Sequence, residues 1–339
     1  MLGSMLGMSK TYNDNSTIQK AAIQSSFELI KESIDALDIP QVNIIADYGS
    51  SQGVNSIYTI KQIIDYLRQT NKCVKDPLVI HNDLPTNDWT SLFQLLVKDN
   101  SYYGVASGHS FYEQCLPNNS VGIGYCSTSI HWLSKKPCNI LNHCLIDAVT
   151  CPKVNEEFRQ QAYLDYCQFL KHRSSELISG GILILVVLAT NKEGKRGNEE
   201  FHNILYECAQ LLPFTSNELI DYTIPAYFRS YDECVDEKLF AQYSFDLIKS
   251  QNVMMEPPFL KSWKEEQITF DEFARLSTSF VRGWSESIVE QTLTNNGRTR
   301  ADIPELLNQF WNLFEENLRK KPDLGNISFE YVQIALKKK

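Results

Sequence analysis

The sequence predicts a doubly wound α/β fold, and two observations support this prediction. In the first half of the chain, short apolar segments of strand length alternate with longer segments of helical periodicity. One of the apolar segments ends in Asp47-Tyr48-Gly49, and a second glycine follows at Gly53. Strands that are separated by helices pair in parallel and are covered by helices on both faces. We therefore expect a mostly parallel sheet with a ligand site at the carboxyl ends of its strands.

The elements of the first half follow from the hydrophobic pattern. The predicted strands are Val42–Asp47, Leu78–Asn82, Val121–Cys126 and Ile182–Leu188. The predicted helices are Thr17–Leu37, Ser56–Thr70 and Asn155–Ser179. We expect Gly180-Gly181 to stop the last of these helices, because glycine is common just past a helix end.

The pattern becomes mainly helical after about residue 190. Helices are predicted over 198–212, 271–293 and Ile303–Lys320, and Pro304 in the last of them suits a first helical turn. Two extended segments, Tyr243–Ser250 and Ile327–Leu336, lie between and after these helices.

These patterns divide the chain into three parts. Residues 1–190 are predicted to form an α/β core, and residues 191–320 a largely helical cap interleaved with late core strands. Residues 321–339 then supply a final core strand and a basic tail.

Composition and charge restrict the function. The 339 residues carry a formal net charge of -9, which disfavours a nucleic acid partner because phosphate binding needs a basic surface. The nine cysteines form no C-x-x-C pair, and the amino terminus shows no basic segment before a long apolar core. Free thiols in the cytoplasm are therefore expected. The longest hydrophobic run, Ile182 to Ala189, is too short to cross a membrane.

The segment Asn43–Gly53 carries the first candidate site. Its apolar run ends at Asp47, whose carboxylate suits the acceptance of hydrogen bonds, and Gly49 permits a sharp turn. Gly53 removes side-chain bulk where the next helix begins. The spacing differs from the G-x-G-x-x-G of pyrophosphate binders and suits a cofactor without phosphate, such as S-adenosylmethionine. A purely structural strand-turn-helix is the alternative.

Further candidates follow the next strands. Asp83 comes just past the second strand, where one carboxylate can hold both hydroxyls of a ribose. A simple Asn-Asp-x-Pro turn is the alternative. Ser110 and Phe111 suit the edge and the face of an adenine, and an aromatic anchor beneath a loop is the competing interpretation.

The segment 126–134 ends in an imidazole and an indole. Trp132 has a donor-only N–H that suits a carboxylate or carbonyl oxygen. His131 is either a general base or a wall of a pocket, and the residues alone leave both open.

Other chemistries find little support. Cys138, His143, Cys144 and Cys151 match no standard zinc spacing. The sequence has no G-x-G-x-x-G of a nicotinamide-dependent oxidoreductase.

Taken together, these segments resemble the SABATH family of S-adenosylmethionine-dependent methyltransferases, which methylate small carboxylic acids and, in some members, ring nitrogens. The resemblance covers roughly residues 10–335 and rests on motifs that occur in order. The motifs are Tyr12-Asn13-Asp14-Asn15-Ser16-Thr17-Ile18-Gln19, residues 45–56, 82–88, 108–112, 129–134 and 158–181, and Ile224-Pro225-Ala226-Tyr227.

The resemblance implies a Rossmann-like methyltransferase fold with a seven-stranded, mostly parallel sheet, S-adenosylmethionine as cofactor, and a homodimer. It implies that Gln19 and Trp132 grip a substrate carboxylate. With the motif analysis, it predicts cofactor contacts from Tyr12, Ser16, Asp47, Gly49, Ser50, Asn55, Asp83, Leu84, Ser110, Phe111 and Ser127. The predicted substrate pocket adds Thr128, His131, Tyr227, Phe228, Phe280 and Trp284.

Several residues depart from the family pattern. Tyr48 replaces the usual Leu, and Ser50 stands where Cys is common. Thr128 occupies a position often held by Tyr beside the substrate, so a benzoate- or salicylate-like preference does not transfer. Ile220 stands where some members have an acidic magnesium ligand, and we predict no metal.

We therefore predict an enzyme that converts a small carboxylic acid to its methyl ester. One alternative is an N-methyltransferase of a xanthine-like heterocycle, which Gln19 and Trp132 would also serve. The other is an inert small-molecule binder with the same fold.

Overall fold

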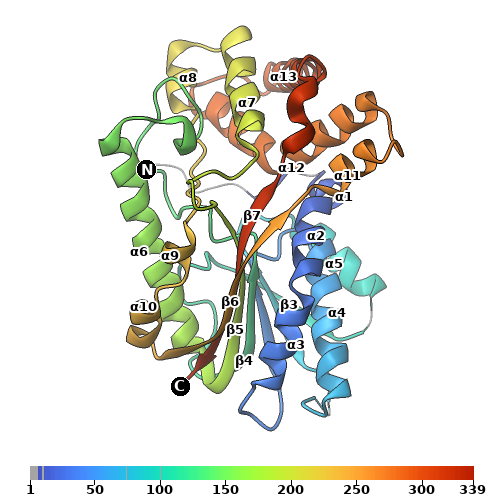
Figure 1. The fold of residues 1–339 in the computed structure, drawn as a ribbon, viewed down its shortest axis with the longest axis vertical. Helices are drawn as coiled ribbons and strands as arrows, with labels where there is room; N and C mark the ends of the chain where they lie inside the picture. Colours follow the sequence, from blue (N-terminus) through green and yellow to red (C-terminus); the bar gives the residue numbers. More distant parts are fainter. Residues whose placement is uncertain (1–6, 10, 74, 100) are drawn as a thin grey trace.

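The computed structural model describes residues 7–9, 11–73, 75–99 and 101–339, so residues 1–6 of the amino terminus considered above lie outside it. A seven-stranded sheet with the order β3-β2-β1-β4-β5-β7-β6 forms its centre (Figure 1). The first five strands of this order run parallel, and β7 is antiparallel to both of its neighbours. This arrangement confirms the predicted mixed, mostly parallel sheet.

Six strands fall on predicted segments, and one does not. The strands are β1 Ile44–Tyr48, β2 Leu78–Asp83, β3 Tyr103–Gly108, β4 Val121–Ser127, β5 Leu177–Ala189, β6 Phe245–Met255 and β7 Phe329–Lys338. The missing prediction was β3. It is an edge strand with Tyr103 and Val105 exposed, so its sequence lacks the apolar run of a buried strand.

Helices cover both faces of the sheet and one end of it (Figure 1). In that view α2, α3, α4 and α5 lie on one side and α6, α9 and α10 on the other, while α7, α8, α11, α12 and α13 gather beyond one end. Their bounds are α1 Tyr12–Asn15, α2 Thr17–Ser25, α3 Phe27–Asp35, α4 Val54–Gln69, α5 Trp89–Lys98, α6 Pro152–Glu176, α7 Glu199–Leu211, α8 Ser216–Asp221, α9 Tyr231–Cys234, α10 Glu237–Gln242, α11 Pro258–Lys264, α12 Phe270–Asn295 and α13 Ile303–Arg319. Pro304 lies in the first turn of α13, as predicted.

The predicted helix Thr17–Leu37 is divided in two. The division falls at Ser26, between α2 and α3. The Ser26 hydroxyl donates to the carbonyl oxygen of Ile23 at 2.7 Å, and this local bond competes with continued helix geometry.

The prediction that Gly180-Gly181 stops a helix was wrong. Helix α6 ends at Glu176, and both glycines lie inside β5. A Cβ on Gly180, which has a φ of +81°, would lie 2.4 Å from the carbonyl oxygen of Asp38. A Cβ on Gly181 would lie 2.9 Å from the carbonyl oxygen of Gly122. The pair therefore permits close backbone approach at the start of a strand.

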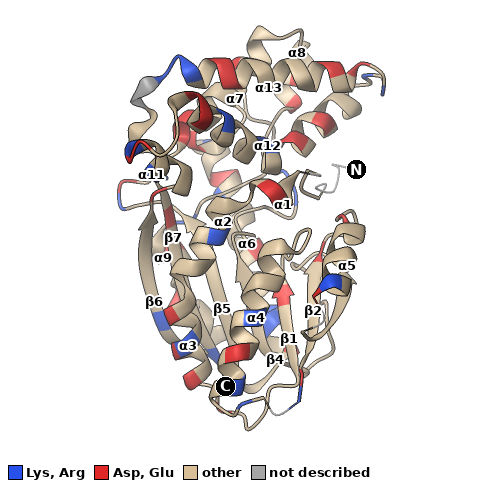
Figure 2. Ribbon diagram, turned by 90° about the vertical axis from the view of Figure 1, so that its right-hand side faces the viewer, with Lys and Arg blue, Asp and Glu red and all other residues tan. Residues whose placement is uncertain are grey.

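Charged residues of both signs are intermingled over the sheet region and the helical end (Figure 2). Within the described residues, no helix combines the length and the apolar character that crossing a membrane requires.

Candidate active site

The turn after β1 depends on glycine, as the sequence analysis expected. Gly49 has a φ of +91°, and a Cβ there would lie 2.2 Å from the Ser129 hydroxyl oxygen. The amides of Gly49 and Ser50 both donate to the carbonyl oxygen of Asn82, at 2.8 Å and 3.0 Å. Gly53 precedes α4 with a φ of +103°, and a Cβ there would lie 2.5 Å from Leu92 Cδ1. The two glycines therefore let β1, its turn and α4 pack against the neighbouring strand end.

The carboxylate of Asp83 is fixed at the end of β2. Its two oxygens accept hydrogen bonds from the backbone amides of Ser51 and Leu84, each at 2.7 Å. Burial raises the pKa of Asp83, while these two amides favour the ionised form. Each carboxylate oxygen keeps a further lone pair, so a vicinal diol can bind to both.

Two residues of β2 that the sequence analysis did not single out hold the neighbouring loop. The Asn82 amide nitrogen donates to the carbonyl oxygens of Ser107 and His109, each at 2.9 Å. His81 lies between the hydroxyls of Ser56 and Tyr102, and burial lowers its pKa to about 4. The sequence signal that could have identified these two residues is their polar character inside an otherwise apolar strand.

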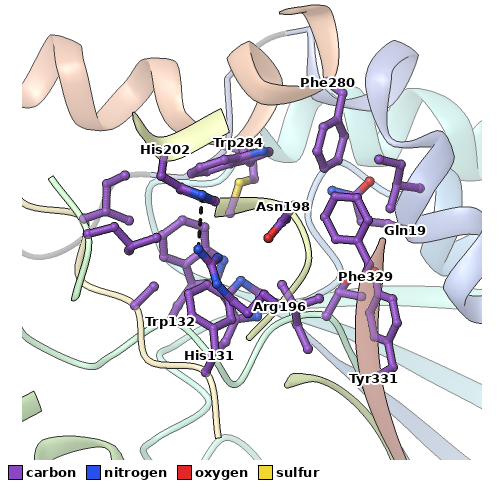
Figure 3. A pocket seen from close by; sticks show the side chains of 18 of the residues that line it. Gln19, His131, Trp132, Arg196, Asn198, His202, Phe280, Trp284, Phe329 and Tyr331 are labelled. Atoms are coloured by element: carbon purple, nitrogen blue, oxygen red, sulfur yellow. Dashed lines mark hydrogen bonds between the residues drawn. The ribbon is translucent and has the colours of Figure 1, made fainter. Parts of the chain in front are cut away.

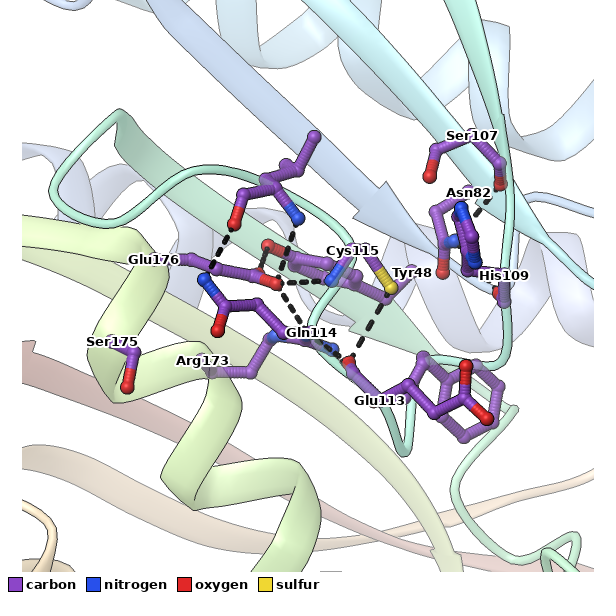
Figure 4. A network of polar contacts seen from close by, with 12 residues as sticks. Tyr48, Asn82, Ser107, His109, Glu113, Gln114, Cys115, Arg173, Ser175 and Glu176 are labelled. Carbon is purple, nitrogen blue, oxygen red and sulfur yellow. Dashed lines mark hydrogen bonds and ion pairs between the residues drawn. The ribbon is translucent and has the colours of Figure 1, made fainter.

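A buried ion pair anchors the loop that carries Ser110 and Phe111 (Figure 4). The Arg173 guanidinium donates to the carbonyl oxygen of Phe111 at 2.7 Å and to Glu176 at 2.8 Å. Glu176 also accepts the Tyr48 hydroxyl at 2.6 Å. The Tyr48 side chain, which departs from the family pattern, thus links the end of β1 to this loop.

A cleft of about 420 Å³ opens over the ends of β1 and β2. Its lining includes the Asp83 carboxylate, which is predicted to hold the ribose. It also includes the Ser110 hydroxyl and the Phe111 ring, which are predicted to contact the adenine. Among the predicted residues, it contains Tyr12, Gly49, Asp83, Leu84, Ser110, Phe111, Thr128 and Trp132. The Phe111 ring packs edge-on against Tyr112 and Phe169, which keeps it in place beside the cleft.

A smaller polar cavity lies beside this cleft and shares Tyr12, Gly49 and Thr128 with it. Its lining adds Gln19, Asp47, Ser50, Asn55 and Ser127. Burial raises the pKa of Asp47 to about 7, and a hydrogen bond with Ser56 offsets part of this increase. Ser16 lies behind this wall, where its hydroxyl and carbonyl oxygens accept the Asn55 amide at 2.9 Å and 3.2 Å.

The cleft and its smaller neighbour suit S-adenosylmethionine. The hydroxyls of Ser50, Ser51 and Ser127 are buried and find no hydrogen-bond partner within the described part of the chain. Buried polar atoms normally have partners, so these atoms mark positions for polar groups of a ligand. The fixed Asp83 carboxylate supplies the diol acceptor, and Phe111 supplies an aromatic wall.

Backbone pairing from a distant segment positions Trp132. Trp132 forms an antiparallel bridge with Ala226, and the Leu133 amide donates to the carbonyl oxygen of Pro225 at 2.8 Å. The Tyr112 hydroxyl donates to the carbonyl oxygen of Trp132 at 2.6 Å. The segment around Pro225 and the loop beside the cleft therefore jointly fix the indole.

A second, mainly apolar cavity also has Trp132 in its lining (Figure 3). It contains most of the predicted substrate residues, namely Gln19, Thr128, His131, Trp132, Phe228, Phe280 and Trp284. His131 stacks on Phe228 at a centroid distance of 5.4 Å, and burial together with the charges of Arg196 and Arg229 lowers its pKa to about 3. His131 is therefore a neutral wall residue near neutral pH.

The prediction that Tyr227 lines the substrate pocket was wrong. Its hydroxyl donates to Glu233 at 3.0 Å, and its side chain lines a different cavity, with Arg159 and Asp232. Consecutive residues in an extended segment point to opposite sides, so Phe228 reaches the apolar cavity and Tyr227 does not.

The cleft that contains Asp83 and the apolar cavity meet at a few shared side chains. Tyr12, Thr128 and Trp132 line both. Thr128 has a φ of +51°, which is strained for a β-branched residue, and its amide donates to the carbonyl oxygen of Val186 at 2.8 Å. A cofactor in the cleft and a substrate in the cavity would therefore face each other across these residues.

No cluster of three His, Cys, Asp or Glu side chains suited to a metal ion occurs among the described residues. Asp221, next to the position of the family's metal ligand, instead pairs with Lys136 at 2.6 Å.

The fold is shared with a protein of known class. A solved structure of loganic acid methyltransferase with SAH has the same fold, with a TM-score of 0.81, 20% sequence identity and 99% of each chain covered. This likeness shows a methyltransferase fold, and the match to a family model defines the class.

The chain belongs to the S-adenosylmethionine-dependent carboxyl methyltransferase family, whose model matches residues 5–339, and this confirms the SABATH resemblance. A probable S-adenosylmethionine-dependent methyltransferase of Arabidopsis thaliana is 29% identical over 327 residues, covering 87% of this chain and 90% of the relative. A benzoic acid/salicylic acid carboxyl methyltransferase of Petunia hybrida is 32% identical over 232 residues, covering 62% of this chain and 64% of the relative. The enzyme class and the cofactor expected from the sequence are thereby confirmed.

Proposed function

We propose that this protein methylates the carboxylate of a small organic acid and releases the methyl ester. The observation that carries this proposal is the junction, at Tyr12, Thr128 and Trp132, of a cleft that contains the Asp83 carboxylate with a mainly apolar cavity. The cleft suits the cofactor, and the cavity suits the hydrocarbon body of an acid.

We assign cofactor binding to the cleft and its smaller neighbour. The contacts are Tyr12, Asp47, Gly49, Ser50, Asp83, Leu84, Ser110, Phe111 and Ser127, with Asn55 supported from behind by Ser16. Substrate binding falls to Gln19, Thr128, His131, Trp132, Phe228, Phe280 and Trp284.

The mechanism requires alignment more than acid–base chemistry. When bound, S-adenosylmethionine supplies a sulfonium methyl group that is already activated for displacement. Gln19 and Trp132 hold the acid through neutral donors, and rotation of the Gln19 amide presents its NH₂ group to the cavity. The apolar walls exclude water, so the carboxylate is less solvated and remains nucleophilic. A carboxylate is already ionised at neutral pH, so His131 need not act as a base.

A methyl-transfer assay tests this function. The assay uses S-adenosylmethionine labelled in its methyl group, with aromatic, aliphatic and indolic acids and with xanthines as acceptors. We expect a base-labile ester from one class of acid. A base-stable product from a xanthine would instead support the N-methyltransferase alternative. That alternative is kept because a relative named paraxanthine methyltransferase 2, from Arabidopsis thaliana, is 30% identical over 196 residues, 52% of this chain. Cofactor binding without transfer to any acceptor would support the inert binder.

Variants of Gln19 and Trp132, which together we call the carboxylate clamp, make the test more specific. Gln19→Ala and Trp132→Ala should each lower kcat/KM by about 100-fold, because misplacing the reacting oxygen costs alignment. Their affinity for S-adenosylmethionine, measured by calorimetry, should change by only a few fold. Gln24→Ala, on the exposed face of the same helix, is the matched control and should retain activity. Equal activity in the clamp variants and the control would refute the assigned roles.

Three further properties are proposed with this function. Residues 191–320 act as the substrate cap, the chain forms a homodimer, and the protein works in the cytoplasm with neither a nucleic acid nor a membrane partner. The SABATH resemblance supports the cap and the dimer. The net charge of -9 argues against a nucleic acid partner, and the nine free cysteines support a reducing compartment. The described residues include no helix suited to crossing a membrane. Sedimentation equilibrium tests the dimer, and a fluorescent fusion tests the compartment.

A further inference from the structure

The apolar cavity contains buried polar side chains that the proposed carboxylate clamp does not use. Arg196, Asn198 and His202 line it with exposed fractions of 2%, 5% and 3%. Figure 3 shows Arg196 and Asn198 between the aromatic group that contains Trp132 and the opposite wall that contains Gln19. They come from the segment that follows β5 and begins α7.

Two polar atoms of this group are unsatisfied. The Arg196 guanidinium is paired with Asp147, and its Nη2 lies 3.1 Å from His202 Nδ1. Burial and the charge of Arg196 lower the pKa of His202 well below its usual value, so its neutral ring accepts this hydrogen bond. The Nε–H donor of Arg196 and the amide oxygen of Asn198 remain without partners within the described residues. One free donor and one free acceptor therefore line the same cavity.

The backbone holds this segment in place without using those atoms. Glu199 accepts the amides of Arg196 and Gly197 at 2.7 Å and 3.0 Å. Gly197 has a φ of +85°, and a Cβ there would lie 2.1 Å from the Ser328 hydroxyl oxygen. The backbone that carries Arg196 and Asn198 is thus fixed, and a polar group of a ligand in the cavity would satisfy their unpaired atoms.

We propose that the substrate acid carries an uncharged hydroxyl group, remote from the reacting carboxylate, which accepts from Arg196 Nε and donates to Asn198 Oδ1. This inference rests on the proposed function. A hydroxyl both donates and accepts, as the two atoms require. A second carboxylate only accepts, and it would meet the Asn198 oxygen and the negative charge of Asp147, which already balances Arg196.

The lining of the two cavities sets the position of this hydroxyl. Arg196 and Asn198 line the apolar cavity and not the cofactor cleft. The reacting carboxylate must face the cleft across Tyr12, Thr128 and Trp132, so the hydroxyl belongs at the other end of the acid. Acids hydroxylated at the end remote from the carboxylate therefore suit this site, and 2-hydroxy acids do not.

Competition between matched acids tests the inference. The probes are two pairs, 3-phenylpropanoate against 3-(4-hydroxyphenyl)propanoate and octanoate against 8-hydroxyoctanoate, with octanedioate as a diacid for comparison. Each acid is assayed by transfer of a labelled methyl group. We expect kcat/KM to be at least tenfold higher for the hydroxylated member of one or both pairs, because the acid without it leaves both buried atoms unpaired.

Variants show whether the two side chains cause this preference. Arg196→Met and Asn198→Leu should each bring the ratio of kcat/KM values towards one. Asn198→Leu breaks no ion pair, so it keeps the test valid if Arg196→Met fails to fold. Asn203→Leu, in the adjoining helix α7, is the control. The Asn203 side chain bonds His143 and Glu200 instead, so this variant should keep the parent ratio.

The other outcomes overturn the inference in distinguishable ways. Methylation of both members of each pair at equal rates, or faster methylation of octanoate or octanedioate, refutes the hydroxyl site and leaves the proposed function intact. Absence of ester from every acid overturns the proposed function and this inference together.

Discussion

The carboxyl group of Asp47 lies almost fully buried at the end of β1, and burial raises its pKa to about 7. In the unfolded chain the same group titrates near about 3.9. Between these pH values the native state binds more protons than the unfolded state, so the free energy of unfolding falls as pH rises. The contribution of Asp47 is therefore most favourable near pH 4 and is lost as the pH approaches 7.

This pH dependence of the free energy of unfolding gives a prediction for Asp47→Asn. The variant lacks the titration, so its free energy of unfolding should rise relative to the parent by up to about 1.4 kcal/mol per pH unit between pH 4.5 and 7. Urea denaturation at several pH values measures this difference. Asp65→Asn, with an exposed side chain, is the control and should show a flat difference. A flat difference for Asp47→Asn as well would contradict the raised pKa.

At the scale of elements, the network of Tyr48, Arg173 and Glu176 joins β1, α6 and the loop after β3 (Figure 4). One Glu176 oxygen accepts Arg173 and the amides of Cys115 and Leu116, while the other accepts only the Tyr48 hydroxyl among the described residues. The family pattern has Leu at this position, so the sequence marked Tyr48 as unusual but did not indicate its partner.

Removing that hydroxyl should destabilise the protein. Tyr48→Phe leaves a buried carboxylate oxygen unpaired, and we expect a loss of about 2 kcal/mol in the free energy of unfolding. Guanidinium denaturation followed by circular dichroism measures it. The matched control is Tyr58→Phe. The Tyr58 hydroxyl accepts an exposed hydrogen bond from the Gln24 amide, so its loss should change stability by less than about 0.5 kcal/mol. Similar losses in both variants would show that the network adds nothing beyond an ordinary surface bond.

At the scale of the whole molecule, cofactor binding should couple to folding. S-adenosylhomocysteine at 100 times its Kd should stabilise the native state by about 2.7 kcal/mol, because a ligand that binds only the native state shifts the folding equilibrium. Asp83→Ala removes the diol acceptor, so the rise in Tm should shift to higher ligand concentrations. Differential scanning fluorimetry over a ligand series measures this, with Asp65→Ala as the control. Identical titrations for the parent and Asp83→Ala would refute the ribose assignment.

The sequence by itself determined the alternation of strands and helices, the need for glycine at 49 and 53, and the motifs that identify the family. These features are local, because hydrophobic period and turn chemistry act over a few neighbouring residues. The local pattern did not predict the exposed edge strand β3, and it misplaced the glycines of β5. Residues far away in the sequence set the environment of both.

The tertiary structure alone decided which side chains share a cavity. The sequence pattern placed Tyr227 and Phe228 together, and the fold sends them to different cavities. It passed over Arg196 and Asn198, whose unsatisfied atoms appear only when residues from β5, α7 and the segment around Trp132 enclose one space. Hydrogen-bond satisfaction of a buried atom depends on every group packed around it, and contacts between residues far apart in the chain supply most of those groups.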